Sequence, residues 1–200
     1  MMMNYEILAA LTLFSFVSSI TPGPNNLMLM SSGANFGFKK TIPHMLGVGL
    51  GFTFMVTLVG LGIMQVFDRF PITHDILKVF SVAYLLYLAA KIAMSTSTVE
   101  SQSSKSKPFT FIQAAMFQWV NPKGWTMALT AISVYVPSQS VSAVLLVAIM
   151  FGIVNVPCVS VWVVLGQKIQ VYLTNERRLK VFNISMATLL VLSLYPVLLS

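Results

Sequence analysis

Two short polar segments built around proline interrupt the apolar parts of the chain, and their residue types suit the binding of a small zwitterion. The first reads Thr-Pro-Gly-Pro-Asn-Asn over residues 21–26, and the second reads Asn-Pro-Lys-Gly over residues 121–124. Proline removes a backbone donor and ends a helix, so unpaired carbonyl and N–H groups are expected at each segment. Together with amide side chains and one lysine, such groups can bind a carboxylate and an ammonium group. The residues expected to break the helices are Pro22, Gly23, Pro24, Pro122 and Gly124.

The second break places a lysine at a position that is energetically unfavourable for a cation in a helix. Asn121 suits the N-cap and Pro122 the first helical position, so the following helix should direct free N–H groups at the break. Lys123 comes next, at the positive end of the helix dipole and inside an apolar segment, where a lone charge costs at least about 2.5 kcal/mol. Either Lys123 binds the carboxylate of a ligand, or carbonyls of the other break satisfy it together with Asn121 and Gln118. A shallow position at the membrane interface is the third alternative.

The first break offers uncharged polar groups. Asn25 and Asn26 carry amides that can bind a zwitterion, Thr21 adds a hydroxyl, and Gly23 lets the backbone approach a ligand closely. The alternative is that the two asparagines cap the helix that follows. Asn155, which precedes Pro157 in a later apolar segment, either faces the same cavity or bonds to a neighbouring helix.

The elements that position these groups are membrane helices. Hydrophobic residues make up 56% of the chain, charged residues 8%, and the mean hydropathy is +0.83, which excludes a soluble domain of this size. Most of the apolar segments reach the roughly 20 residues that cross a bilayer. The apolar segments cover residues 7–20, 42–67, 76–94, 109–136, 141–165 and 179–199. The first of them continues from residue 27, after the polar break. The sequence predicts an all-α membrane protein with six transmembrane helices.

Helix length predicts the depth of both breaks. Residues 7–20 rise about 21 Å and residues 109–120 about 18 Å at about 1.5 Å per residue, which is less than the roughly 30 Å of hydrocarbon. Both breaks should therefore lie near the middle of the membrane, in the first and fourth helices. The alternative is a loop that ends a short interfacial helix.

The spacing of the segments predicts an internal repeat. Pro22 and Pro122 are 100 residues apart, and the later helices of the two halves show similar offsets. Residues 1–94 should form one three-helix repeat and 109–200 a second, joined by a cytoplasmic Ser- and Lys-rich linker at 95–108. Since three spans are odd, the second repeat should insert upside down. Paired breaks in inverted repeats mark the substrate site of many transporters.

Charge predicts orientation, because Lys and Arg concentrate in cytoplasmic loops. Nine basic residues follow the first, third and fifth spans and should share the cytoplasmic side, with both termini on the other side. The region 1–6 lacks a basic leading segment, so we expect no cleavable signal peptide and a first apolar segment that remains as a span. The net charge of +7 reflects orientation, and no basic aromatic surface indicates nucleic-acid binding.

The sequence argues against an enzyme and against cofactors. Neither His44 nor His74 belongs to an H-E-x-x-H pattern, no G-x-S-x-G occurs, and Cys158 is the single cysteine, so neither a catalytic set nor a metal site is predicted. All five acidic residues fall at helix ends or in loops, so no carboxylate proton relay is visible within the spans.

The two breaks and the glycine spacing at residues 47–51 resemble the lysine exporter and homoserine/threonine resistance family (LysE/RhtB) over essentially the full length. The asparagine-rich first motif is most similar to neutral amino-acid and cysteine/O-acetylserine exporters. The resemblance puts Pro22, Gly23, Pro24, Asn121, Pro122 and Lys123 at the motif positions.

The resemblance implies export of amino acids or their derivatives across the bacterial inner membrane, driven by the proton motive force through alternating access. The partners expected are a small amino-acid-like substrate and the lipid bilayer; a homo-oligomer is compatible with the sequence, which does not decide it. A small-solute channel or pore is the alternative, since broken polar helices also line pores.

Overall fold

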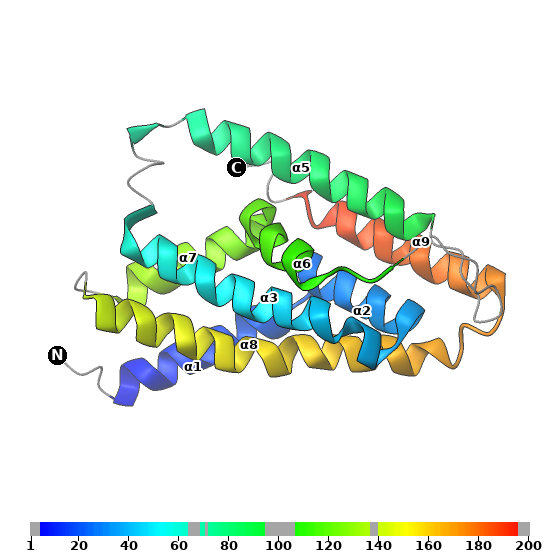
Figure 1. The fold of residues 1–200 in the computed structure, drawn as a ribbon, viewed down its shortest axis with the longest axis horizontal. Coiled ribbons are helices and arrows are strands. Elements are labelled where there is room, and N and C mark those ends of the chain that lie inside the picture. Colours follow the sequence, from blue (N-terminus) through cyan, green and yellow to red (C-terminus); the bar gives the residue numbers. More distant parts are fainter. Residues whose placement is uncertain (1–4, 64–68, 71, 95–106, 137–139, 196–200) are drawn as a thin grey trace.

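Every regular element in the described part of the chain is helical (Figure 1), as the composition predicted. The computed structural model describes residues 5–63, 69–70, 72–94, 107–136 and 140–195. The helices are α1 (Tyr5–Ile20), α2 (Pro24–Phe36), α3 (Phe38–Leu58), the π-helical turn η1 (Val59–Ile63), α5 (Ile72–Ala93), α6 (Phe111–Phe117), the 3-10 turn η2 (Gln118–Val120), α7 (Pro122–Tyr135), α8 (Val141–Gln170) and α9 (Glu176–Leu192).

Three described helices are long and apolar enough to cross a bilayer, namely Phe38–Ile63, Asp75–Ala93 and Val141–Gln170. The pair α1 and α2, bent by 54° at its break, makes a fourth span if it is counted as one. The chain is therefore a multi-pass membrane protein. Six spans, the inverted repeat and the division at residues 94 and 109 stay predictions, and residues 95–106 of the expected linker lie outside the described residues.

The helices alternate in direction along the length of the bundle (Figure 1). The path through α1 and α2 runs opposite to the path through α6 and α7, and the same holds for α3 against α8 and for α5 against α9. Corresponding helices also pack on one another, because α3 contacts α8 and α5 contacts α9, while α2 packs on α8 and α6 packs on α3. This arrangement brings the two breaks to the middle of the bundle.

Close helix approach depends on glycine where α3 meets α6. A Cβ added at Gly47 would lie 2.4 Å from the carbonyl oxygen of Phe111, and one at Gly51 would lie 2.6 Å from Cα of Ala115. The small-xxx-small pair that the sequence contains therefore sets the distance between these helices, because neither position has room for a side chain.

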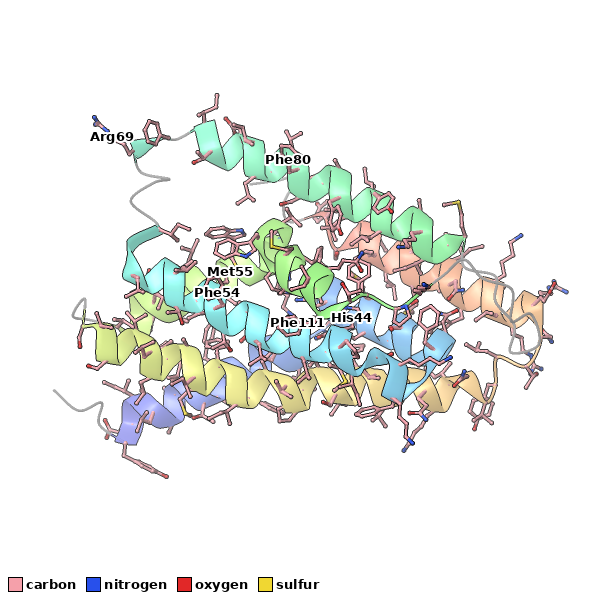
Figure 2. The ribbon with its side chains drawn as sticks, viewed as in Figure 1. His44, Phe54, Met55, Arg69, Phe80 and Phe111 are labelled. Atoms are coloured by element: carbon pink, nitrogen blue, oxygen red, sulfur yellow. The ribbon has the colours of Figure 1, made fainter. Side chains whose placement is uncertain are left out.

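The polarity of the bundle is that of a protein in lipid. Its outer surface carries large apolar side chains such as Leu13, Phe80 and Ile153, all more than 60% exposed, and Figure 2 shows Phe80 on the outer side of α5. Its interior buries polar side chains, among them Gln118 and Asn183 at 0% exposure. Buried polar groups in lipid need partners, so they define the interior of the bundle.

The positive charges lie mostly at one end. The α2–α3 turn, the end of α5 and the α8–α9 connection meet at one end of the bundle, on the right in Figure 1, which we call the basic end. Gly37 makes the α2–α3 turn there with a positive φ of 78°. The described basic residues at this end are Lys39, Lys40, Lys91, Lys107, Lys168, Arg177, Arg178 and Lys180; Lys105 lies outside the described residues. Arg69 lies at the opposite end (Figure 2). Which end faces the cytoplasm stays a prediction.

Candidate functional site

The first break is present where the sequence predicted it. Thr21, Pro22 and Gly23 separate α1 from α2, and Pro24 occupies the first turn of α2. Gly23 is extended at the N-cap position, with φ −177° and ψ 176°, and no side chain caps this helix start. The carbonyls at the end of α1 therefore lose their helical donors in the interior of the bundle.

Side chains replace the two backbone donors that the prolines remove. In a continuous helix the carbonyls of Ser18 and Ile20 would accept from the N–H groups four residues later, and both of those residues are proline. The Thr21 hydroxyl instead donates to the Ser18 carbonyl at 3.1 Å, and Nε1 of Trp162 on α8 donates to the Ile20 carbonyl at 3.1 Å. The break is thus stabilised by groups outside the backbone.

Asn26 stabilises the end of α1 rather than the start of α2. Its Nδ2 donates to the Ser19 carbonyl at 2.8 Å and to the Thr21 carbonyl at 2.7 Å. The alternative that the asparagines cap the following helix is therefore wrong: Asn26 reaches backwards, because the bend at the break turns the carbonyls of α1 towards it.

We expect Trp162→Phe to destabilise the protein by about 1–3 kcal/mol, because the Ile20 carbonyl would be left without a donor in the interior of the bundle. Thermal unfolding of the purified protein in detergent would measure the change. Trp119→Phe is the matched control, since within the described residues the Trp119 indole nitrogen makes no hydrogen bond. Equal loss in the two variants would mean that ring size, and not the hydrogen bond, is what matters.

The second break lies between η2 and α7. Asn121 is extended (φ −93°, ψ 106°) at the N-cap of α7 and Pro122 follows in its first turn, as predicted. The Asn121 side chain, however, makes no capping hydrogen bond. Its Oδ1 is buried without a partner. The start of α7 is therefore not neutralised by its own N-cap side chain, and it stays available to an anion.

Lys123 joins the two breaks. Its Nζ donates to the Thr21 carbonyl at 2.8 Å, to the Thr21 hydroxyl at 2.9 Å and to the Pro22 carbonyl at 3.4 Å. Carbonyls of the first break thus satisfy the lysine in this conformation, whereas the expected bonds to Asn121 and Gln118 are not formed. Gly23 permits the approach, since a Cβ there would lie 2.7 Å from Cδ of Lys123.

A second link joins Asn25 to Gln118. Nδ2 of Asn25 donates to Oε1 of Gln118 at 2.8 Å, and Nε2 of Gln118 donates back to Oδ1 of Asn25 at 3.2 Å. Gln118 also donates to the Ala114 carbonyl of α6 at 2.8 Å. The reciprocal amide pair holds α2 against the end of α6. The two breaks are therefore joined by two links, this pair and the bonds of Lys123.

The breaks enclose a small cavity, which we call the central cavity. Its volume is about 20 Å³, enough for about one water molecule. The predicted site residues that line it are Gly23, Asn25, Asn26, Asn121, Lys123, Gly124 and Asn155, and Ser19, Phe52 and Gln118 lie among the other lining residues. Of the remaining predicted residues, Thr21 contacts Lys123 from the edge of the site, and the three prolines form the breaks. The structure therefore brings together residues that are more than 90 positions apart in the sequence.

Asn155 has both of the roles that the sequence left open. Its Nδ2 donates to the Ser19 hydroxyl of α1 at 3.1 Å, so it bonds to a neighbouring helix, and the same residue lines the central cavity. Its Oδ1 is buried without a partner, like that of Asn121. Two unpaired acceptors thus line one cavity, an arrangement that suits a ligand with several donors, such as an ammonium group.

Sequence reasoning missed Trp162 and Ser19. Both lie in apolar helical segments with no local signal, and only the packing of α8 on α1 brings them to the break. The described residues contain no group of His, Cys, Asp or Glu that could hold a metal ion.

Comparison with known proteins decides the family. The family model described as LysE type translocator matches residues 16–194. The chain belongs to this family. The resemblance seen at the two breaks is thereby confirmed, and so is the prediction that the chain is not an enzyme, since the members of the LysE family are translocators.

Curated relatives in the LysE family are named as efflux proteins. The chain is 31% identical over 173 residues to a cysteine/O-acetylserine efflux protein of Escherichia coli (strain K12), with 84% of this chain and 86% of the relative covered. The same name, identity and coverage apply to a relative from Shigella sonnei (strain Ss046). No solved structure matches the chain.

Proposed function

We propose that this LysE family protein exports amino acids or their derivatives from the bacterial cytoplasm across the inner membrane. The observation that carries the proposal is the central cavity, where an ammonium group (Lys123) and two unpaired amide oxygens (Asn121 and Asn155) lie between two broken helices. The relatives named cysteine/O-acetylserine efflux proteins support a small neutral amino acid or amino-acid derivative as the substrate. Such cargo is zwitterionic at neutral pH.

In the proposed complex the substrate lies between Lys123, which now bonds to the first break, and two amide oxygens that have no partner among the described residues. Its carboxylate binds the Lys123 ammonium and the uncapped start of α7, where the helix dipole favours an anion. Its ammonium group donates to Oδ1 of Asn121 and Oδ1 of Asn155. Thr21, Asn25 and Asn26 hold the first break in place, and Thr21 receives Lys123 when the substrate leaves.

The volume of the central cavity implies that transport requires movement. About 20 Å³ does not hold an amino acid, so the first break must separate from α7 when a substrate binds. Lys123 spans that boundary through its bonds to Thr21 and Pro22. We propose that a substrate carboxylate replaces these carbonyls as the partner of Lys123, and that two inverted three-helix repeats then rock around the site, driven by the proton motive force.

Proteoliposomes test the function directly. With the purified protein reconstituted, we expect saturable transport of labelled cysteine or O-acetylserine, acceleration by the same unlabelled substrate on the opposite side, and dependence on an imposed proton gradient. Large unitary currents without counterflow would favour a channel instead. Failure to move any member of an amino-acid mixture would reject the proposal.

We expect Asn121→Leu and Asn155→Leu each to raise the KM for transport about tenfold or more, because a hydrogen bond to a charged group is worth roughly 1.5–3 kcal/mol. Initial rates in proteoliposomes would measure the change. Asn175→Leu is the control, since that side chain caps α9 by accepting from the Arg178 backbone N–H, outside the cavity. If KM is unchanged in both cavity variants, the amide oxygens do not contact the substrate.

A further inference from the structure

A second pocket, whose walls are mostly apolar and carry a few polar side chains, lies at the basic end, and the proposed function above does not use it. Its volume is about 70 Å³, larger than that of the central cavity. Helices α2, α3 and α5 and the segment before α6 form its walls. Its polar lining residues are Ser31, Ser32, Asn35, His44, Lys91 and Lys107. Among its described lining residues the only charged side chains are the two lysines.

Within the described residues, no acidic side chain neutralises the charged groups of this pocket. Lys91 and Lys107 are exposed at its rim, and Nζ of Lys91 lies 5.7 Å from the ring centroid of Phe109. Among the described residues no Asp or Glu forms a salt bridge with either lysine, and cation–π attraction to Phe109 holds Lys91 at the opening. Two cations beside one small opening attract an anion, and they do so most strongly at low salt.

His44 adds a polar group at the floor of the pocket. It is 2% exposed, and neither of its buried ring nitrogens has a hydrogen-bond partner in the part of the chain that the structure describes. Its ring packs against Phe109 at a centroid distance of 5.2 Å. This packing fixes the position of the imidazole but gives its nitrogens no hydrogen bond. A buried imidazole with no hydrogen bond is costly, and a ligand oxygen in the pocket would accept from its N–H group.

Helix α2 connects this pocket to the central cavity. Asn25 and Asn26 line the central cavity, while Met28, Ser31 and Ser32 line the basic-end pocket. Asn25 and Ser32 are two helical turns apart, about 10 Å at about 1.5 Å per residue. The two pockets therefore share one helix as a wall.

We propose that the basic-end pocket is a second substrate site, which binds the carboxylate of the amino acid before it reaches the central cavity. Lys91 and Lys107 attract the carboxylate, His44 donates to it, and the apolar walls formed by Leu88 and Phe109 accept the rest of the molecule. This inference rests on the proposed export function and specifies the path by which the cargo arrives.

Transport from each face of the membrane tests the inference. In vesicles of both orientations, we expect Lys91→Gln/Lys107→Gln to raise the KM about five- to tenfold for substrate supplied at the basic end, with an unchanged maximal rate and an unchanged KM at the other face. Lys91→Arg/Lys107→Arg should restore the wild-type KM. The control is Lys39→Gln/Lys40→Gln, which removes two exposed charges at the same end that do not line the pocket.

A substrate that lacks the carboxylate distinguishes binding in this pocket from a general effect of surface charge. With the methyl ester of the same amino acid, the wild type and the Lys91→Gln/Lys107→Gln variant should show equal KM values. An equal KM with the free amino acid, or an equal effect in the Lys39/Lys40 control, overturns the second site and leaves the export function intact. Absence of transport by the wild type overturns both.

Discussion

Lys123→Ala should lower export at least tenfold while the protein still inserts into the membrane. The substitution removes the only ammonium group in the described lining of the central cavity and with it the proposed partner of the substrate carboxylate. It also removes three hydrogen bonds between α7 and the first break, to the Thr21 carbonyl, the Thr21 hydroxyl and the Pro22 carbonyl. A bond to a charged group contributes roughly 1.5–3 kcal/mol, so loss of the substrate contact alone gives about a tenfold change.

Three variants separate binding from structure in this experiment. Lys168→Ala removes an exposed lysine of α8 and should transport like the wild type. Thr21→Val removes one partner of Lys123 but leaves its charge, so it should lower thermal stability more than it changes KM. Lys123→Arg keeps the charge and should retain more export than Lys123→Ala. Wild-type rate and KM in Lys123→Ala, measured per inserted molecule in proteoliposomes, would show that Lys123 does not bind the substrate.

Gly166→Ala should lower the stability of the protein strongly, because the added methyl group has no room. A Cβ at Gly166 would lie 2.0 Å from the Met30 carbonyl oxygen and 2.9 Å from the Ala34 backbone nitrogen. These are backbone atoms of α2, so no side chain can move aside and α8 must shift as a whole. Overpacking of this kind costs about 3 kcal/mol, which lowers the apparent unfolding midpoint by about 6–12 °C for a chain of this size.

Gly124→Ala is the matched control for that measurement. A Cβ at Gly124 would lie 3.5 Å from Nδ2 of Asn121, which is ordinary van der Waals contact. Alanine also favours a helix by up to about 1 kcal/mol over glycine, so this variant should unfold no earlier than the wild type. Similar midpoints for Gly166→Ala and Gly124→Ala in detergent would mean that α2 and α8 are not held at this distance in solution.

The positions of the breaks could be predicted because they depend on local chemistry. Proline lacks an N–H group, and where it stands beside Gly or Asn, as at Pro22, Pro24 and Pro122, one helix has ended and the next begins. Proline alone is not sufficient, because Pro43 and Pro157 lie inside α3 and α8. The partners at the breaks could not be predicted in the same way. Asn26 returns to the end of α1, and Asn121 occupies an N-cap without capping, because the bend angle and the packing of other helices direct these side chains.

The sequence by itself determined that the chain is a helical membrane protein, where its helices break and which family it resembles. These properties follow from hydropathy, helix length and proline, which act over a few residues. Only the tertiary structure decided that Lys123 bonds to Thr21 and Pro22, that Trp162 satisfies Ile20, and that Asn121 and Asn155 line one cavity. The bonds of Lys123 and Trp162 join residues 101 to 142 positions apart. They depend on how closely helices pack, which here is set by glycines at α2–α8 and α3–α6.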